Sequence, residues 1–97
     1  MKPQNILYIM SDEHSSKMAG CYGHEMVQTP NIDKLAARGT RFTAHYTNSP
    51  ICIPARAAFA TGRYTHETKY WDNATPYDGA VKGWGHRLQE EGIRVES

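Results

Sequence analysis

The stretch that decides the fold reads Asn5-Ile6-Leu7-Tyr8-Ile9-Met10, and it stops abruptly at Ser11-Asp12-Glu13-His14. A short and continuously apolar run is typical of a strand that is covered on both faces, as in a parallel sheet. In open α/β sheets, ligands bind at the carboxyl ends of the strands. Asp12 is therefore expected to be a functional carboxylate at the end of a first strand.

The next segments extend this pattern to strand, helix, strand. Thr29 is expected to cap a helix that begins at Pro30 and ends at Gly39 in a left-handed conformation. Residues 40–47 alternate between apolar and polar side chains, which predicts a second strand. The connection is long enough for a right-handed parallel crossover, so the α/β class is expected.

The second half of the chain is expected to hold two more helices. The first runs from about Pro54 to Ala60, with Gly62 as its cap, and residues 63–80 form a long surface or site-forming loop. A helix around Trp84 is closed by Gly92, and a strand starts at Ile93. Three large side chains are expected in the core: Tyr46, Trp84 and Leu88.

Composition limits the function classes. The 97 residues carry eleven basic and ten acidic side chains, so no basic face for nucleic acid is indicated. No apolar run approaches the roughly 18 residues of a membrane span. The two cysteines are too few for a disulfide scaffold. The N-terminus lacks the features of a signal peptide, so a cytoplasmic location is expected, or a periplasmic one if a leader was removed.

The segment that carries chemistry runs from Cys52 to Arg63, with the sequence CIPARAAFATGR. A cysteine at a helix N-terminus feels the helix dipole and the free backbone N–H groups. Arg56 follows about one helical turn later on the same face. Such a place favours an anion and can hold a tetrahedral oxyanion. Taken by itself, the segment would also suit a buried cysteine before an ordinary helix, with Arg56 as a surface cation.

The pattern Cys-x-Pro-x-Arg followed by Thr-Gly-Arg resembles the signature of the sulfatases in the alkaline phosphatase superfamily. Residues 5–13, 29–36 (TPNIDKLA), 39–42 and 48–52 are similar to other stretches of that family, in the same order. The resemblance covers essentially the whole chain. It implies that residues 1–97 are the N-terminal, incomplete part of a single catalytic domain with a mainly parallel sheet and an alkaline-phosphatase-like fold.

The resemblance also implies a chemistry. Cys52 would be oxidised to formylglycine by a formylglycine-generating enzyme, which reads Cys52, Pro54 and Arg56, and the hydrated aldehyde would be the nucleophile. A divalent cation would be held by Asp12 and the modified Cys52; calcium is the usual ion, with Mg²⁺ or Mn²⁺ as alternatives. Arg56 would orient the diol. The substrate would be a small sulfate ester or a sulfated sugar, with no nucleic acid or membrane as partner.

Some positions depart from the family pattern. Ala55 stands where serine is usual, and Glu13 replaces a second aspartate, which makes it a secondary candidate for metal binding. The downstream metal pair, lysine and histidine of the family fall outside these 97 residues. Two alternatives therefore stay open: a phosphonate or phosphate monoester hydrolase of the same superfamily, and a truncated, non-catalytic fragment.

Other polar side chains have simpler explanations. A zinc site is suggested by His14, Cys21 and His24, but no second close pair completes it, so these are expected to be loop residues. A solvated face is expected for Lys34, Arg38 and Arg41. A substrate pocket or an ordinary surface loop would equally suit His66, Tyr70, Trp71, Asp72 and Asn73.

Overall fold

The computed structural model describes residues 5–96, and within that range helices are the regular elements. The chain divides into two compact units between Thr43 and Ala44, and each unit is described by itself. Within the described residues, no helix combines the length and the apolar character needed to span a membrane.

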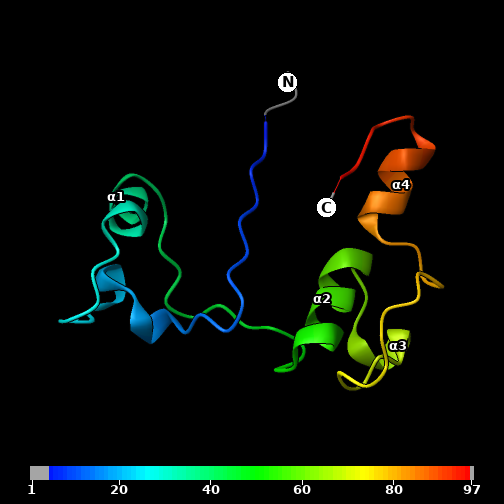
Figure 1. Cartoon of the computed structure of the whole chain (residues 1–97), viewed down its shortest axis with the longest axis horizontal. Coiled ribbons are helices and arrows are strands. Elements are labelled where there is room, and N and C mark those ends of the chain that lie inside the picture. Colours follow the sequence, from blue (N-terminus) through cyan, green and yellow to red (C-terminus); the bar gives the residue numbers. More distant parts are fainter. Residues whose placement is uncertain (1–4, 97) are drawn as a thin grey trace. The chain divides into compact units, whose positions relative to one another are not determined.

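The first unit contains helix α1 (Pro30–Arg38) and two short 3₁₀ turns, η1 (Ser16–Met18) and η2 (Gly20–Tyr22) (Figure 1). The carboxylate of Asp33 on α1 joins these elements, because its Oδ1 accepts hydrogen bonds from the Cys21 N–H at 2.7 Å and the Thr29 hydroxyl at 2.9 Å. The same hydroxyl accepts a hydrogen bond from the Gly20 N–H at 2.9 Å. The first turn of α1 is thus tied to η2.

Helix α1 begins at Pro30, as predicted, but both of its predicted caps are wrong. The Thr29 side chain makes no capping bond to the helix, since it is engaged with Gly20 and Asp33. Gly39 has φ −119°, which is extended rather than left-handed backbone, although its N–H still bonds the Leu35 carbonyl at 3.0 Å. Local chemistry located this helix correctly, while the contacts of Thr29 with Gly20 and Asp33 decided how its N-terminus is held.

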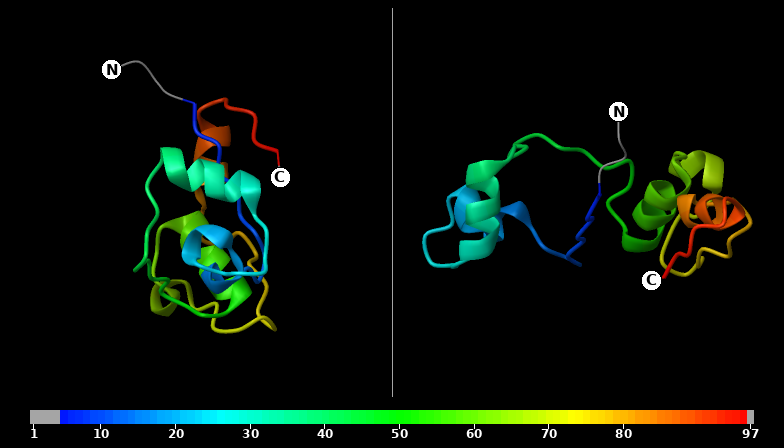
Figure 2. Two further views of the ribbon diagram at one scale, coloured as in Figure 1. Left: turned by 90° about the vertical axis from the view of Figure 1, so that its left-hand side faces the viewer. Right: turned by 90° about the horizontal axis from the view of Figure 1, so that it is seen from above.

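The second unit gathers helices α2 (Cys52–Thr61), α3 (Thr65–Thr68) and α4 (Trp84–Glu90), as both views in Figure 2 show. The core of this unit is small. Its buried side chains on α2 are Pro54, Ala57 and Ala58, and Tyr70 after α3 is 6% exposed.

Helices α2 and α4 approach closely at one glycine. Gly83, the residue before α4, is buried against the end of α2, and a Cβ placed on it would lie 3.0 Å from the Ala60 carbonyl oxygen. The Gly83 N–H is satisfied by Nδ1 of His86 at 3.2 Å. Because this distance is shorter than an ordinary van der Waals contact, any larger residue here would force α4 and the end of α2 to shift apart.

The predicted strands are wrong within the described residues: residues 5–10, 40–47 and 93–95 form no strand. The first of these segments runs as an extended trace (Figure 1), and its Ile6 and Leu7 are 91% and 84% exposed. A strand needs the backbone groups of a neighbouring strand as hydrogen-bond partners. None of the three segments has such a neighbour in the described part of the chain. Each of them is therefore extended or irregular backbone, despite its apolar pattern.

Two of the three expected core side chains are also wrong. Tyr46 is 87% exposed and Trp84 is 50% exposed, while Leu88 is half-buried. The reason is the same as for the strands. A sheet that would cover these rings does not form among residues 5–96.

Candidate functional site

Cys52 is the first residue of α2 and its side chain is exposed. The preceding residue, Ile51, occupies the capping position in extended conformation, with φ −111° and ψ 142°. Helix α2 therefore starts two residues before the predicted Pro54. This places the thiol at the positive end of the helix dipole.

The first turn of α2 is held by one backbone and one side-chain contact. The Ala55 N–H donates to the Ile51 carbonyl at 3.0 Å, and the Ile53 N–H donates to Oδ1 of Asn73 at 3.0 Å. Pro54 has no N–H to satisfy, and its ring is fully buried. The proline of the Cys-x-Pro-x-Arg pattern thus anchors the turn that presents the cysteine.

Arg56 lies on α2 four positions after Cys52, and its side chain is exposed. Residues separated by four positions are neighbours on a helix surface. The guanidinium group is planar, always charged and suited to bidentate contact with a tetraoxyanion. A helix N-terminus with an arginine one turn away is an arrangement that favours bound anions.

The far end of α2 follows the sequence prediction. Gly62 has φ +67°, and its N–H bonds the Ala58 carbonyl at 2.9 Å. The Thr61 hydroxyl donates to the Ala57 carbonyl at 2.7 Å. The Thr-Gly pair of the pattern therefore closes the helix, and the predicted left-handed cap at Gly62 is confirmed.

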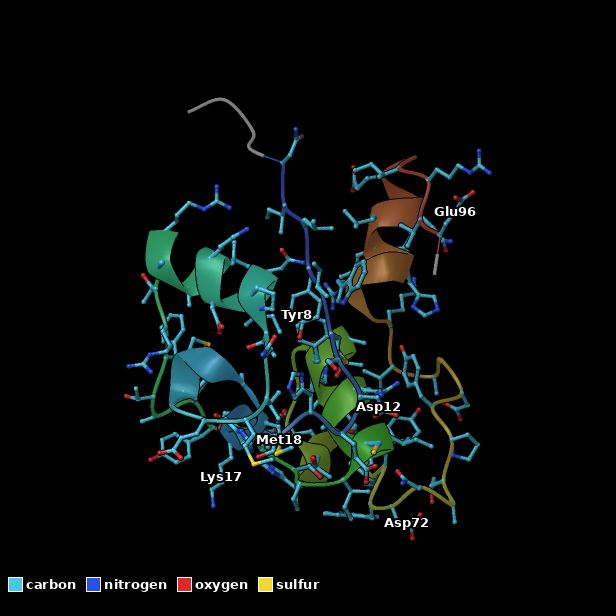
Figure 3. All side chains as sticks on the ribbon, turned by 60° about the vertical axis from the view of Figure 1, so that its left-hand side comes forward. Tyr8, Asp12, Lys17, Met18, Asp72 and Glu96 are labelled. Carbon is cyan, nitrogen blue, oxygen red and sulfur yellow. The ribbon has the colours of Figure 1, made fainter. Side chains whose placement is uncertain are left out.

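The loop after α3 is ordered by its own hydrogen bonds. The buried Tyr70 donates its hydroxyl to Oδ1 of Asp78, and its ring meets Tyr77 edge-on at 5.5 Å. Oδ1 of Asp72 accepts hydrogen bonds from the Ala74 N–H at 2.9 Å and from the Thr75 N–H at 3.0 Å. Figure 3 marks Asp72 in this loop.

The contact between Tyr70 and Asp78 affects both titrations. The hydrogen bond from Tyr70 lowers the pKa of Asp78 below its usual 3.8, with help from the Ala80 N–H. The same hydrogen bond, together with burial, raises the pKa of Tyr70 above its usual 10.0. The hydrogen bond between Tyr70 and Asp78 therefore persists across the loop at neutral pH, because neither group titrates there.

Asp12 belongs to the first unit, whereas Cys52 and Arg56 belong to the second, so the two parts of the predicted site are described separately. Asp12 and Glu13 form a turn directly after the extended N-terminal segment (Figure 3). Glu13 has φ +52°, in the left-handed region that non-glycine residues seldom adopt. The two carboxylates follow the apolar run, but the run forms no strand, so the predicted position of Asp12 at a strand end is not found in the described residues.

The described residues contain no group of three or more histidine, cysteine, aspartate or glutamate side chains able to hold a metal. His14 contacts the Met18 carbonyl through Nε2 at 3.2 Å, and His24 accepts the Val27 N–H at Nδ1 at 2.9 Å. An open hollow of about 730 Å³ in the first unit is lined partly by Cys21, His24 and Arg41. Neither Asp12 nor any residue of α2 lines it.

Arg41 was expected on a solvated face, and its side chain is exposed. It nevertheless donates to the Cys21 carbonyl, and its guanidinium carbon lies 5.2 Å from the centre of the Tyr22 ring. The exposed arginine therefore also holds η2 in place.

The structure thus places an exposed cysteine at the N-terminus of α2, followed one turn later by an exposed arginine. Residues 4–94 match the Sulfatase family, and the chain belongs to that family. Membership implies an α/β fold of the alkaline phosphatase type, whereas the described residues supply helices alone. No solved structure matches the chain.

Several curated proteins are similar to this chain. It is 36% identical over 94 residues to N-acetylglucosamine-6-O-sulfatase of Bacteroides thetaiotaomicron. The aligned region covers 97% of this chain and 17% of that protein. It is 38% identical over 88 residues to choline-sulfatase of Rhizobium meliloti, covering 91% and 17%. It is 50% identical over 60 residues to human steryl-sulfatase, covering 62% and 10%. The chain thus spans less than a fifth of the length of each of these relatives.

Two structural roles were not found from the sequence. Asp33 fixes η2 to α1, and Asn73 accepts the Ile53 N–H at the start of α2. A signal for the second role exists: an aliphatic residue before the helix cannot cap it, so its first N–H groups are expected to bond either water or a side chain from elsewhere. The sequence shows this need but does not identify Asn73 as the residue that meets it.

Proposed function

We propose that this chain is the nucleophile-bearing part of a sulfuric ester hydrolase. The observation that carries the proposal is the exposed Cys52 at the first position of α2, within the Cys-x-Pro-x-Arg pattern of a chain in the sulfatase family. The family generally uses formylglycine and a divalent metal.

The proposed nucleophile is formylglycine made from Cys52. In this conversion the side chain loses its sulfur and two hydrogens and gains one oxygen, so an external oxidant and a formylglycine-generating enzyme are required. Water then adds to the aldehyde and gives a carbon with two hydroxyl groups. One hydroxyl oxygen attacks the sulfur of the ester, the bond from sulfur to the alcohol oxygen breaks, and the alcohol leaves with a proton.

The second hydroxyl explains why an aldehyde is useful here. When that hydroxyl loses its proton, the carbon–oxygen double bond re-forms and the bond between carbon and the sulfate oxygen breaks. Sulfate leaves, and water regenerates the diol. A sulfate ester on an ordinary serine has no such internal route, because its carbon carries no second hydroxyl group.

The chain's own residues suit this chemistry in two ways. The N-terminus of α2 places the positive end of the helix dipole near the negative charge that develops on the sulfate oxygens. Arg56, one turn further along, offers a fixed positive charge and forked donors for the same oxygens and for the diol. Together they stabilise charge where the reaction creates it.

The proposed cation would be calcium, with Mg²⁺ or Mn²⁺ as alternatives, bound by Asp12 and the modified Cys52. Carboxylate oxygen is a ligand that these ions prefer, but calcium takes about six to eight oxygens. The described residues do not form such a set, so no step above depends on the metal. For the same reason, we expect negligible sulfate ester turnover by the 97-residue chain alone.

Sulfate esters are favoured over phosphonate or phosphate esters because the three relatives above are each named as sulfatases. Their names point to different alcohols: an amino sugar, choline and a sterol. We therefore propose the reaction class, with a small sulfate ester or a sulfated sugar as substrate.

The proposal is tested by co-expressing the chain with a formylglycine-generating enzyme and labelling aldehydes with an aminooxy probe. The wild-type chain should be labelled at one site, while Cys52→Ala should remain unlabelled. Pro54→Ala and Arg56→Ala should both reduce labelling, because they alter the proposed recognition pattern, and Ala55→Ser should not. Cys21 is the matched control thiol. Labelling that persists in Cys52→Ala would refute the assignment.

A further inference from the structure

We propose that Asn73 is a positioning residue for Cys52, acting as the missing N-terminal cap of α2. This inference rests on the proposed function for its importance to catalysis, while the capping itself can be tested without any activity. The central observation is the 3.0 Å hydrogen bond from the Ile53 N–H to Oδ1 of Asn73, which joins residues twenty positions apart.

Helix α2 has an unusual need for such a partner. The first backbone N–H groups of a helix lack partners within it, and a side chain at the capping position usually accepts one of them. Ile51 occupies that position and has no acceptor, so no local side-chain cap exists. Pro54 removes one donor from the first turn. The Ile53 N–H, immediately after Cys52, is the donor that Asn73 satisfies.

Asn73 is held in place from both sides of its loop. Oδ1 of Asp72 receives the Ala74 and Thr75 N–H groups and the Thr75 hydroxyl, which fixes the turn that contains Asn73. Further out, the buried Tyr70 is joined to Asp78. The acceptor is thus presented by a loop with its own internal bonds, so the loop and the first turn of α2 form one connected structure.

The consequence concerns the backbone at Cys52. Two neighbouring peptide groups determine where the Cys52 side chain points, and the second of them carries the N–H held by Asn73. Loss of this bond would let the residues before the buried Pro54 fray, since they have no side-chain cap of their own. Asn73 would then set the direction of the Cys52 side chain without itself touching substrate.

Amide hydrogen exchange measured by NMR on the whole chain tests this inference directly. Asn73→Ala should speed exchange at the Ile53 N–H by about fivefold, the ratio that corresponds to a typical cap of ~1 kcal/mol. Asn73→Asp keeps the acceptor oxygen and should retain most of the protection. Asp72→Ala, which releases the turn around Asn73, should act in the same direction. Asn31→Ala, the same chemical change in the first unit, is the matched control.

A second readout separates positioning from general stability. In Asn73→Ala the ¹⁵N order parameter of the Cys52 amide should fall, while exchange at the Gly62 N–H, at the other end of α2, should stay as in the wild type. Equal acceleration at Ile53 and Gly62 would overturn the inference, because it would mean that the whole helix is destabilised. Unchanged exchange at Ile53 in Asn73→Ala would also overturn it. Neither result depends on aldehyde formation, so failure here and failure of the proposed function are distinguishable.

Discussion

Replacing Gly83 by alanine should weaken the packing of α4 on α2, the helix that presents Cys52. The new Cβ would lie 3.0 Å from the Ala60 carbonyl oxygen and 3.3 Å from the Ala60 Cβ. The nearest of these atoms belongs to the backbone, so a side-chain rotation cannot relieve the clash. Gly83 has φ −85° and ψ 174°, which alanine adopts easily, so the effect comes from crowding and not from backbone strain.

Gly85, two positions later within α4, provides the matched control. A Cβ there would meet Val95 Cγ1 at 3.6 Å, an ordinary contact. Overpacking at Gly83 should cost roughly 1–3 kcal/mol in the free energy of unfolding. Gly85→Ala should instead gain up to ~1 kcal/mol, since alanine favours helix over glycine. The two variants should therefore differ by about 1–4 kcal/mol, with the wild type between them.

Tryptophan fluorescence during urea unfolding measures this difference in stability. It reports on the second compact unit, because the chain's two tryptophans, Trp71 and Trp84, both lie there. With a slope of about 1 kcal/mol per molar urea, the midpoints of the two variants should lie at least ~1 M apart. A Gly83→Ala variant as stable as Gly85→Ala would refute the account of how α4 packs on α2.

Three further changes test other contacts. Asp33→Ala should speed amide exchange at Cys21 and cost roughly 1–3 kcal/mol in the first unit, because two donors lose a carboxylate acceptor; unchanged exchange at Cys21 would contradict the role of Asp33. Gly62→Ala should cost about 1–2 kcal/mol, because φ +67° disfavours a Cβ; tryptophan fluorescence again measures it. The link between Tyr70 and Asp78 should stabilise the second unit between two limits of pH. The lowered pKa of Asp78 means that its contribution is present above pH 3.8 and is lost as the pH falls further. The raised pKa of Tyr70 means that its contribution is present below pH 10.0 and is lost as the pH rises through the higher folded value. Tyr70→Phe should abolish the alkaline dependence and weaken the acid one, since the Ala80 N–H still bonds Asp78; a pH profile identical to the wild type would contradict this assignment.

Helices α1, α2 and α4 were predictable because their signals are local, whereas the short helix α3 (Thr65–Thr68) lies within residues 63–80, for which the prediction of a loop is wrong at that point. Pro30 begins α1, Gly62 closes α2 in left-handed conformation, and Gly92, with φ +77°, follows α4 as expected. A proline at a first turn or a glycine after a last turn acts through its own backbone geometry, whatever surrounds it. Where a cap depended on distant partners, as at Thr29, the prediction failed.

The strands were not predictable in the same way. An apolar run indicates that a segment favours burial, but it does not identify the segment that would pair with it. Ile6 and Leu7 show the apolar pattern of a buried strand, yet both are exposed in the described residues. The candidate site shows the same difference between features set by neighbouring residues and features set by distant ones. Cys52 was correctly placed at a helix N-terminus by its neighbours in sequence, whereas the hydrogen bond of Asn73 to that helix joins segments that no periodicity connects.

The mass of the tryptic peptide of residues 42–56 tests the central claim most directly. This peptide lies between Arg41 and Arg56 and contains Cys52 as its single cysteine. After co-expression with a formylglycine-generating enzyme, its mass should fall by one sulfur and two hydrogens and rise by one oxygen, while the peptide that contains Cys21 keeps its thiol. A peptide of residues 42–56 that retains the mass of unmodified cysteine under these conditions would contradict the proposal that Cys52 is the precursor of the nucleophile.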